Sequence, residues 1–582
     1  MKNKNKIEDI LMSDREISGV GTVRLLKGRL ARFLNRLGRA LAYSSTRTYG
    51  AFFLSFGLLS LFLNFAKNYF ENTVTTDPVL IWIGASLSAL SVVLMLFDRP
   101  MCIALQDFAP TDYLFFEFFS IKRMHRTEYS EVINPLVGMF LGFIPAIVAF
   151  FVPIQWVLLC IVIIIFVAVS FDTPEFPMIF TLLVLPYITL LPSRALIIAI
   201  LSLVTFSSYL LKVIIGKRIY TFNFMGALVF LFFLLVFISG CMGLGEDSLN
   251  NSLVFISAAL AYFPVSNLTV NRRLADCAIN AVVVSAIPIT ILAIIEFIVE
   301  LPITKIIPPE HSTPGVSVFF TSASTIAAFL LVASAFTVRF AYENRGRLRV
   351  FYSVCFAFEV LALVLSSQPV AWLTAILLPL VFAITRKKRV PTLFVSPIVI
   401  LPYLVYFLPT GILAKISDAL GMVPTFTESI IGYNAAFNIF KENILFGVGI
   451  GKSSFLLAGG GENKIFNTVF GVGVELGVLA LAVLAIIFLF MIFEISYTRY
   501  KIHNSNMKST MRVAFVSVTA LFMYGADMYI FEDASVHYLF WCLIGLFSSA
   551  VTVSEKEHDE RLGYYGDISS FDSSVIDITL NR

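Results

Sequence analysis

The chain has 582 residues, of which 58% are hydrophobic and only 14% charged, and its formal net charge is +4. Because an average soluble domain carries about 25% charged residues, no water-soluble fold hides this much apolar surface. The small net charge also excludes a bulk electrostatic attraction to nucleic acid. The bilayer is therefore the main solvent of this protein, and we expect an all-α, polytopic transmembrane helix bundle.

Residues 1–48 form a basic segment that precedes the first apolar run. That run starts near Tyr49, which is too late for the short charged region of a cleavable signal peptide. Within the segment, residues 22–40 alternate basic and apolar side chains at helical spacing. This pattern predicts either an amphipathic helix on the inner leaflet or a charge cluster that only sets topology. We expect the N-terminus to stay attached and cytoplasmic.

Apolar runs recur from residue 49 to residue 554 and predict about 14–16 helices of the roughly 20-residue length that spans a bilayer. We divide them into an N-terminal set, residues 49–300, and a second set, residues 301–554. The polar tail, residues 555–582, is expected to be disordered. The predicted helices start near residues 50, 79, 133, 155, 176, 194, 222, 250, 276, 318, 350, 369, 390, 467, 512 and 535.

With the N-terminus inside, lysines and arginines concentrate in the cytoplasmic segments, as the positive-inside rule requires. This topology predicts a multi-pass protein of the cell membrane with both termini in the cytoplasm. Few cations then remain outside to hold an anionic ligand. The external segments receive only seven of the 42 lysines and arginines, namely Lys67, Arg194, Lys305, Lys415, Lys441, Lys452 and Lys464.

The six cysteines lie in or beside apolar runs and form no CxxC pair. This placement indicates neither a disulfide framework nor a structural zinc site. No acidic cluster demands a divalent ion either. The sequence therefore predicts no metal and no cofactor.

The longest external segment is the loop of residues 409–466, which includes a helical-looking piece at 427–443. Gly447, Gly449 and Gly451 follow this piece, and Asn467 opens the next helix. Long loops of compact proteins are usually functional or disordered, and the aromatic and glycine content here argues against disorder. We take this loop as the candidate site.

The loop and the helix after it resemble the core of the O-antigen ligase and polymerase family of bacterial envelope proteins. The resemblance rests on YNAAFNIFKENILFGVGIGKSSF (433–455) and IFNTVFGVGVELGVLALAVL (465–484), with Asn443, the three glycines, Asn467, Glu475 and Gly477 at family positions. Two helix starts, FFTSASTIAAFLL (319–331) and SSQPVAWLTAILL (366–378), also resemble family motifs. Four motifs in order carry more weight than one glycine pattern. Together they cover roughly residues 310–550.

The resemblance implies transfer of a glycan from an undecaprenyl diphosphate carrier to an acceptor glycan or lipid at the outer face of the membrane. Other glycan-assembly proteins are implied as possible partners. Such a reaction needs cations for the diphosphate leaving group and a base for the acceptor hydroxyl. In this chain Gln368 takes the place of a family arginine, and Phe466 takes the place of a family histidine.

Other side chains are candidates for these two roles. Arg194, Lys441 and Lys452 are candidate diphosphate ligands, although a snorkelling arginine and solvated lysines are the alternative interpretation. Asp527 and His537 are candidates for an orienter and base pair, and His311 is a second candidate base. The alternatives are a structural role for each histidine and an interhelical hydrogen bond for Asp527. Glu475 and Glu359 are further charges near or within apolar runs, where charge is costly. For Glu359 we expect an interhelical hydrogen bond that holds the bundle together.

Three functions are compatible with these features. The first is a glycan polymerase or ligase, as the resemblance implies. The second is a transporter or flippase of lipid-linked oligosaccharides, which also needs many helices and buried charges. The third is a family member without catalysis that serves as a scaffold, because the arginine and histidine positions are substituted.

Overall fold

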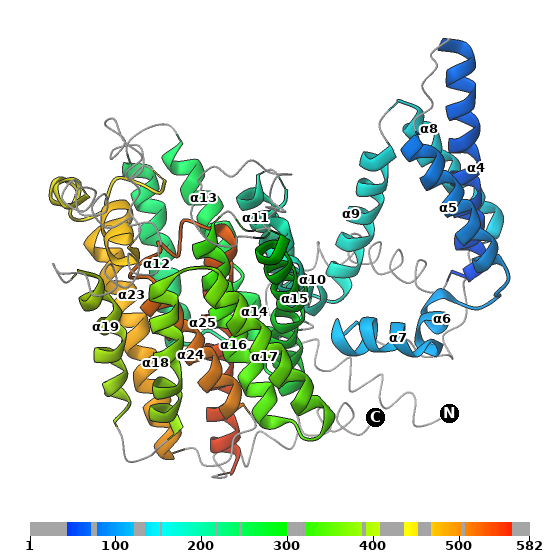
Figure 1. Ribbon diagram of the computed structural model, residues 1–582. Coiled ribbons are helices and arrows are strands. Elements are labelled where there is room, and N and C mark those ends of the chain that lie inside the picture. The colour runs from blue at the N-terminus through cyan, green and yellow to red at the C-terminus, as the bar shows by residue number, and fades with distance from the viewer. Residues whose placement is uncertain are drawn as a thin grey trace. The chain divides into compact units, whose positions relative to one another are not determined.

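In the computed structural model, every regular element of the described residues is a helix (Figure 1). The all-α prediction is therefore confirmed. The described residues are 44–71, 78–121, 134–151, 154–191, 193–216, 218–243, 247–299, 318, 320, 322–386, 391–407, 436–451, 467–501 and 507–561. The basic segment 22–40, His311 and Lys452 lie outside this set.

Ten helices among the described residues are long and apolar enough to cross a bilayer, and five shorter apolar helices accompany them. Each predicted span coincides with a described helix, because runs of about 20 apolar residues leave the chain few other solutions in lipid. The protein is thus a multi-pass membrane protein. The ten are α4, α11, α12, α15, α16, α17, α18, α23, α25 and the consecutive pair α13 and α14.

The helices pack into two compact units, residues 1–176 with 208–218 and residues 177–207 with 219–582. The boundary falls inside α10 (Glu175–Ile188) and α11 (Arg194–Ile214). The other helices of the first unit are α4 (Thr46–Glu71), α5 (Pro78–Met95), α6 (Met101–Asp107), α7 (Ala109–Thr111), the π-helix η1 (Asp112–Phe118), α8 (Pro135–Phe151) and α9 (Ile154–Asp172).

Small residues hold the first unit together where α4 packs against α5 and α8. Gly57 of α4 lies against α5, where a Cβ atom would come 2.8 Å from the carbonyl oxygen of Gly84. Gly142 of α8 lies closer still to α4, against the Ser55 side chain and the Phe52 backbone. Close backbone approach at small residues is the usual way in which membrane helices associate, since lipid supplies no hydrophobic drive between them.

Replacing Gly142 with valine should destabilise this unit. The new side chain would overlap the backbone of Phe52, which cannot move aside as a flexible side chain would. Overpacking of this kind costs about 1–3 kcal/mol. The measurement is thermal unfolding of the full chain in detergent, with Leu141→Ala, at a 49% exposed neighbour, as the control. Equal unfolding temperatures for Gly142→Val and the wild type would contradict this packing.

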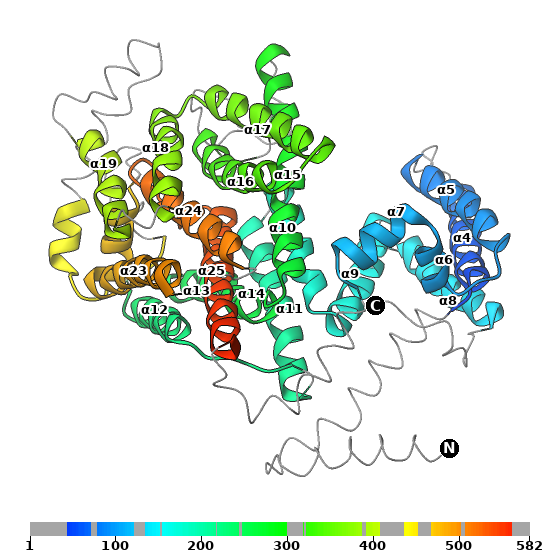
Figure 2. The ribbon, with the colours of Figure 1, turned by 90° about the horizontal axis from the view of Figure 1, so that it is seen from below.

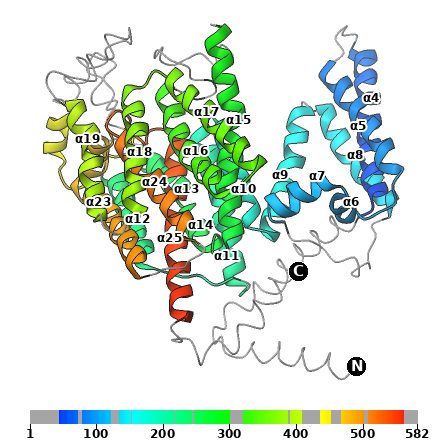
Figure 3. The same ribbon diagram turned by 60° about the horizontal axis from the view of Figure 1, so that its bottom comes forward.

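In the second unit, α24 and α25 lie side by side in the middle, and the other helices of the unit pack around them (Figures 2 and 3). Trp541 of α25 is fully buried and its ring packs 5.3 Å from that of Phe232 and 5.2 Å from that of Phe233. The helices of this unit are α12 (Phe224–Met242), α13 (Ser248–Ala259), α14 (Tyr262–Leu268), α15 (Arg272–Val299), α16 (Ala323–Glu343), α17 (Arg347–Leu365), α18 (Pro369–Arg386), the 3-10 helix η3 (Thr392–Phe394), α19 (Val395–Phe407), a short helix at 436–442, α23 (Thr468–Lys501), α24 (Lys508–Tyr524) and α25 (Ala534–Arg561).

Two sequence-based expectations are refined here. Glu359 of α17 is buried and accepts a 2.8 Å hydrogen bond from the Thr337 hydroxyl of α16, so it joins two helices. The helix α25 continues to Arg561, so the first residues of the segment 555–582 are helical and not disordered.

Candidate functional site

A turn of residues 443–451 follows the helical residues 436–442 (Figure 1, yellow). Gly447, Gly449 and Gly451 have φ angles of 69°, 97° and 75° in this turn. These values lie in the left-handed region, which glycine adopts without the steric cost of a side chain. The three glycines therefore set the path of the backbone here, and we call residues 443–451 the glycine turn.

The glycine turn docks on a break in α23. Gly477 has φ 80° and ψ 176°, which interrupts the helix and releases the carbonyl groups before it. Val448 N donates to the Val474 carbonyl and Gly449 N to the Glu475 carbonyl, both at 2.9 Å. The backbone of the turn therefore replaces the hydrogen bonds that the break removes, as membrane-embedded backbone requires.

Neither side of this junction has room for a side chain. A Cβ atom on Gly447 would overlap the Glu475 carbonyl group, and one on Gly477 would lie 2.6 Å from Phe446 N. On the other side, Gly449 packs against Ser248 at the start of α13. Asn251 Nδ2 also donates to the Ile450 carbonyl at 3.2 Å. The turn is thus enclosed between α23 and α13.

Glu475 connects the turn to two other parts of the unit. Its side chain is 3% exposed, and its two carboxylate oxygens accept from Gly451 N at 3.0 Å and from the Tyr529 hydroxyl at 2.7 Å. Burial raises the pKa of Tyr529 well above its usual range, and the Glu475 carboxylate raises it further. Tyr529 therefore stays protonated and donates. Ser239 of α12 donates to the backbone carbonyl of Glu475 at 2.8 Å. Glu475 thus positions the turn, α12 and the segment that contains Tyr529.

Asn467 and Thr468 attach the start of α23 to the segment 525–533 that joins α24 to α25. Asn467 is fully buried, and its Oδ1 accepts from Val469 N at 2.8 Å while its Nδ2 donates to the Ala526 carbonyl at 3.2 Å. The Thr468 hydroxyl donates to the Met528 carbonyl at 2.7 Å. Asp527, between these two acceptors, is half-buried in this segment beyond the end of α24. The glycine turn, the start of α23 and residues 525–533 form one hydrogen-bonded assembly, which we call the turn assembly.

His537 packs among aromatic rings beside the turn assembly. Its ring is buried, 3.9 Å from the Phe255 ring and 5.5 Å from the Phe531 ring between centroids. Its Nε2 has no hydrogen-bond partner among the described residues. The expected pairing with Asp527 is therefore not seen at this nitrogen, and the imidazole packs as an aromatic side chain.

The predicted diphosphate ligands are only partly placed. The Lys441 side chain is exposed, with Nζ 4.5 Å from the centroid of the Phe437 ring, which is a cation–π contact. Arg194 begins α11 and is half-buried. Gln368 precedes α18 and donates to the Ser366 carbonyl at 3.3 Å. His311 and Lys452 lie outside the described residues, although Lys452 directly follows Gly451 in the chain.

Three residues that hydrogen-bond to the glycine turn or to Glu475 were not expected from the sequence: Tyr529, Ser239 and Asn251. Each comes from a different part of the chain, and none has a sequence signal of its own. A tyrosine in a short interhelical segment near an apolar run is too common to indicate a partner for a particular glutamate. Comparison with protein-family models and with curated proteins gives no match for this chain.

Proposed function

We propose that this protein is a glycan polymerase or ligase of a bacterial envelope, which transfers a glycan from an undecaprenyl diphosphate carrier to an acceptor. One observation carries the proposal: the residues of the resemblance, from Gly447 to Gly451 with Asn467, Glu475 and Gly477, meet in one turn assembly. The distribution of lysine and arginine in the sequence supports an orientation with this assembly at the outer face and both termini in the cytoplasm.

The reaction requires an acceptor hydroxyl to attack the anomeric carbon of the lipid-linked glycan. The bond from that carbon to the diphosphate oxygen breaks, undecaprenyl diphosphate leaves, and the hydroxyl proton passes to a base. Lys441 and Lys452 flank the glycine turn in the sequence, and we assign to them the stabilisation of charge on the leaving diphosphate. Arg194 is the further candidate ligand.

We assign the base to Asp527. Glu475 is unsuitable because both its carboxylate oxygens already accept hydrogen bonds, and His537 is enclosed by aromatic rings. Asp527 is half-buried, and the residues on both sides of it are fixed to the start of α23. A carboxylate held in this way can accept a proton from a positioned hydroxyl.

Asp527→Asn should lower the rate of glycan transfer by about 10²–10⁴-fold, the usual contribution of a general base. The assay supplies purified protein in nanodiscs with a labelled lipid-linked oligosaccharide and an acceptor, and measures released undecaprenyl diphosphate. Glu532→Gln removes an exposed carboxylate from the same segment and serves as the control. Equal rates for Asp527→Asn and Glu532→Gln would reject Asp527 as the base while leaving the proposed reaction intact.

A transporter of lipid-linked oligosaccharide is the second candidate, because broken helices line the substrate sites of many transporters. The break in α23 favours it, but the carbonyls before the break are already occupied by the glycine turn. Movement of the labelled lipid between leaflets of proteoliposomes without release of undecaprenyl diphosphate would favour the transporter. If the lipid is not moved and undecaprenyl diphosphate is not released, the scaffold function is favoured.

A further inference from the structure

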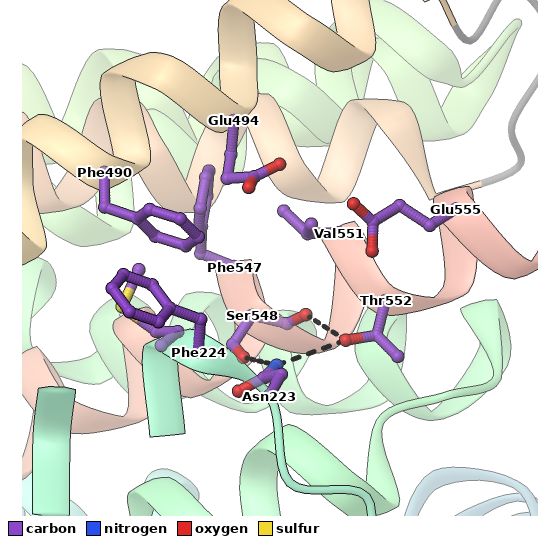
Figure 4. A pocket seen from close by; sticks show the side chains of 10 residues that line it. Asn223, Phe224, Phe490, Glu494, Phe547, Ser548, Val551, Thr552 and Glu555 are labelled. Carbon is purple, nitrogen blue, oxygen red and sulfur yellow. Dashed lines mark hydrogen bonds between the residues drawn. The ribbon is translucent and has the colours of Figure 1, made fainter. Parts of the chain in front are cut away.

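A second site lies at the other end of α12, α23 and α25 from the glycine turn. It is a cavity of about 160 Å³ between the start of α12 and the C-terminal parts of α23 and α25 (Figure 4). None of its lining residues takes part in the turn assembly or in the proposed reaction. The lining residues are Asn223, Phe224, Met225, Phe490, Glu494, Phe547, Ser548, Val551, Thr552 and Glu555.

One wall of the cavity is a fixed polar network. Asn223 Oδ1 accepts from Gly226 N at 2.8 Å and so caps α12. Its Nδ2 donates to Ser548 Oγ at 2.7 Å and to Thr552 Oγ1 at 3.2 Å. Since these bonds lock the amide and both hydroxyls, this wall is already organised without a ligand.

A second wall of the cavity is aromatic. The rings of Phe224 and Phe490 lie 5.1 Å apart between centroids, and Phe547 lies beside them in the cavity (Figure 4). Aromatic faces carry partial negative charge and attract organic cations. They also exclude water, which strengthens any electrostatic interaction inside the cavity.

Two carboxylates, and no lysine or arginine, line the cavity. Glu494 of α23 is only 7% exposed, and its Oε2 has no hydrogen-bond partner in the part of the chain that the structure describes. Glu555 of α25 is half-buried and points toward the same space (Figure 4). A buried carboxylate without a partner is costly, and a second carboxylate beside it adds repulsion. A bound cation would remove both costs.

We propose that this cavity binds the ammonium group of an organic amine, with Glu494 and Glu555 as its counter-ions. The phenylalanines contact the alkyl carbons next to the nitrogen, and the oxygens of Ser548 and Thr552 lie on the polar side. A metal ion suits the cavity less well, because the described residues contain no group of three metal-binding side chains and the aromatic wall offers no ligand. An ethanolamine headgroup and a soluble amine share this chemistry.

The test measures binding of n-butylammonium to the purified full chain in a neutral detergent by calorimetry, with n-butanol and butyrate as probes of equal length. We expect butylammonium to bind more tightly than both. Glu494→Gln should weaken its binding at least tenfold, or about 1.4 kcal/mol. Glu557→Gln, on α25 but outside the lining, should bind as the wild type does.

Nanodiscs distinguish the two sources of the amine. Thermal stabilisation of the wild type by phosphatidylethanolamine in a phosphatidylglycerol bilayer, lost in Glu494→Gln, would identify a lipid headgroup. Stabilisation by butylammonium but not by phosphatidylethanolamine would identify a soluble amine. Equal binding of butylammonium and butanol, or unchanged binding in Glu494→Gln, would overturn the proposal. If Glu494→Gln does not fold, Glu555→Gln and Phe490→Leu must each weaken butylammonium binding.

Discussion

Gly477→Ala should destabilise the second unit by about 2–6 kcal/mol, the combined cost of a glycine-only conformation and of overpacking. The φ of 80° with ψ of 176° is open in practice only to glycine. The added methyl group would also overlap the carbonyl group of Leu445 and lie 2.6 Å from Phe446 N. Thermal unfolding of the full chain in detergent measures the effect, and we expect little folded protein.

Gly473→Ala is the matched control, since it places the same methyl group on the same helix. Its Cβ would meet only the Phe440 ring at 3.5 Å, which is ordinary van der Waals contact, and its φ is not positive. Alanine also favours helix over glycine. The control should therefore unfold at the wild-type temperature or slightly above it. Equal stability of the two variants would show that the break at Gly477 and its contact with the glycine turn are not as described.

Glu475→Ala should be the second large effect, because it leaves the buried Tyr529 hydroxyl without an acceptor and also removes the bond from Gly451 N. The orphaned hydroxyl costs about 1–3 kcal/mol, and the bond lost at the exposed Gly451 costs about 0.5–1.5 kcal/mol. The total is about 1.5–4.5 kcal/mol. We also expect local release of the turn, which hydrogen exchange at the amides of residues 449–451 would measure.

The control for this variant is Glu442→Ala, which removes an exposed carboxylate at the end of the helix 436–442. It should change neither stability nor exchange at the turn. Tyr529→Phe separates the two bonds of Glu475, since it removes the hydroxyl and keeps the bond from Gly451 N. Rapid exchange at residues 449–451 in the wild type itself would contradict the bond between Gly451 N and Glu475.

The helices could be predicted because each one is determined by its own stretch of sequence. An apolar run of spanning length must satisfy its own backbone in lipid, so its position in the sequence locates the helix. The end of α25 escaped prediction because residues 555–582 as a whole are rich in Asp, Ser and Gly, a composition that predicts disorder. Residues 555–561 at its start are nevertheless charged. Glutamate, lysine and arginine are good helix formers, and the helix continues through them.

The turn assembly could be predicted only in part. The spacing of Gly447, Gly449 and Gly451 indicated an unusual backbone, and Glu475 appeared as a charge beside an apolar run. These features bond to each other because α23 is broken at Gly477 and the glycine turn occupies the break. The sequence alone does not reveal this break. Tyr529 comes from the segment after α24, so tertiary packing alone selects it as a partner.

The surroundings of His537 and Glu494 were equally hidden. The sequence places His537 near the start of a helix, but the ring that covers it belongs to Phe255 of α13. Glu494 lies in a long apolar run, and only the packing of α12 and α25 against α23 makes it part of a cavity. Long-range contacts of this kind have no periodicity or spacing that a single sequence reveals.

The measurement that tests the central claim most directly is photo-crosslinking of a lipid-linked oligosaccharide to the purified protein in nanodiscs. A photoreactive group on the sugar next to the diphosphate would be activated, and mass spectrometry would locate the modified peptides. The account predicts crosslinks within residues 436–451 and 525–533, and it predicts that an excess of unlabelled lipid-linked donor reduces them. Crosslinks confined to the opposite ends of α12, α23 and α25, or insensitive to competitor, would contradict it.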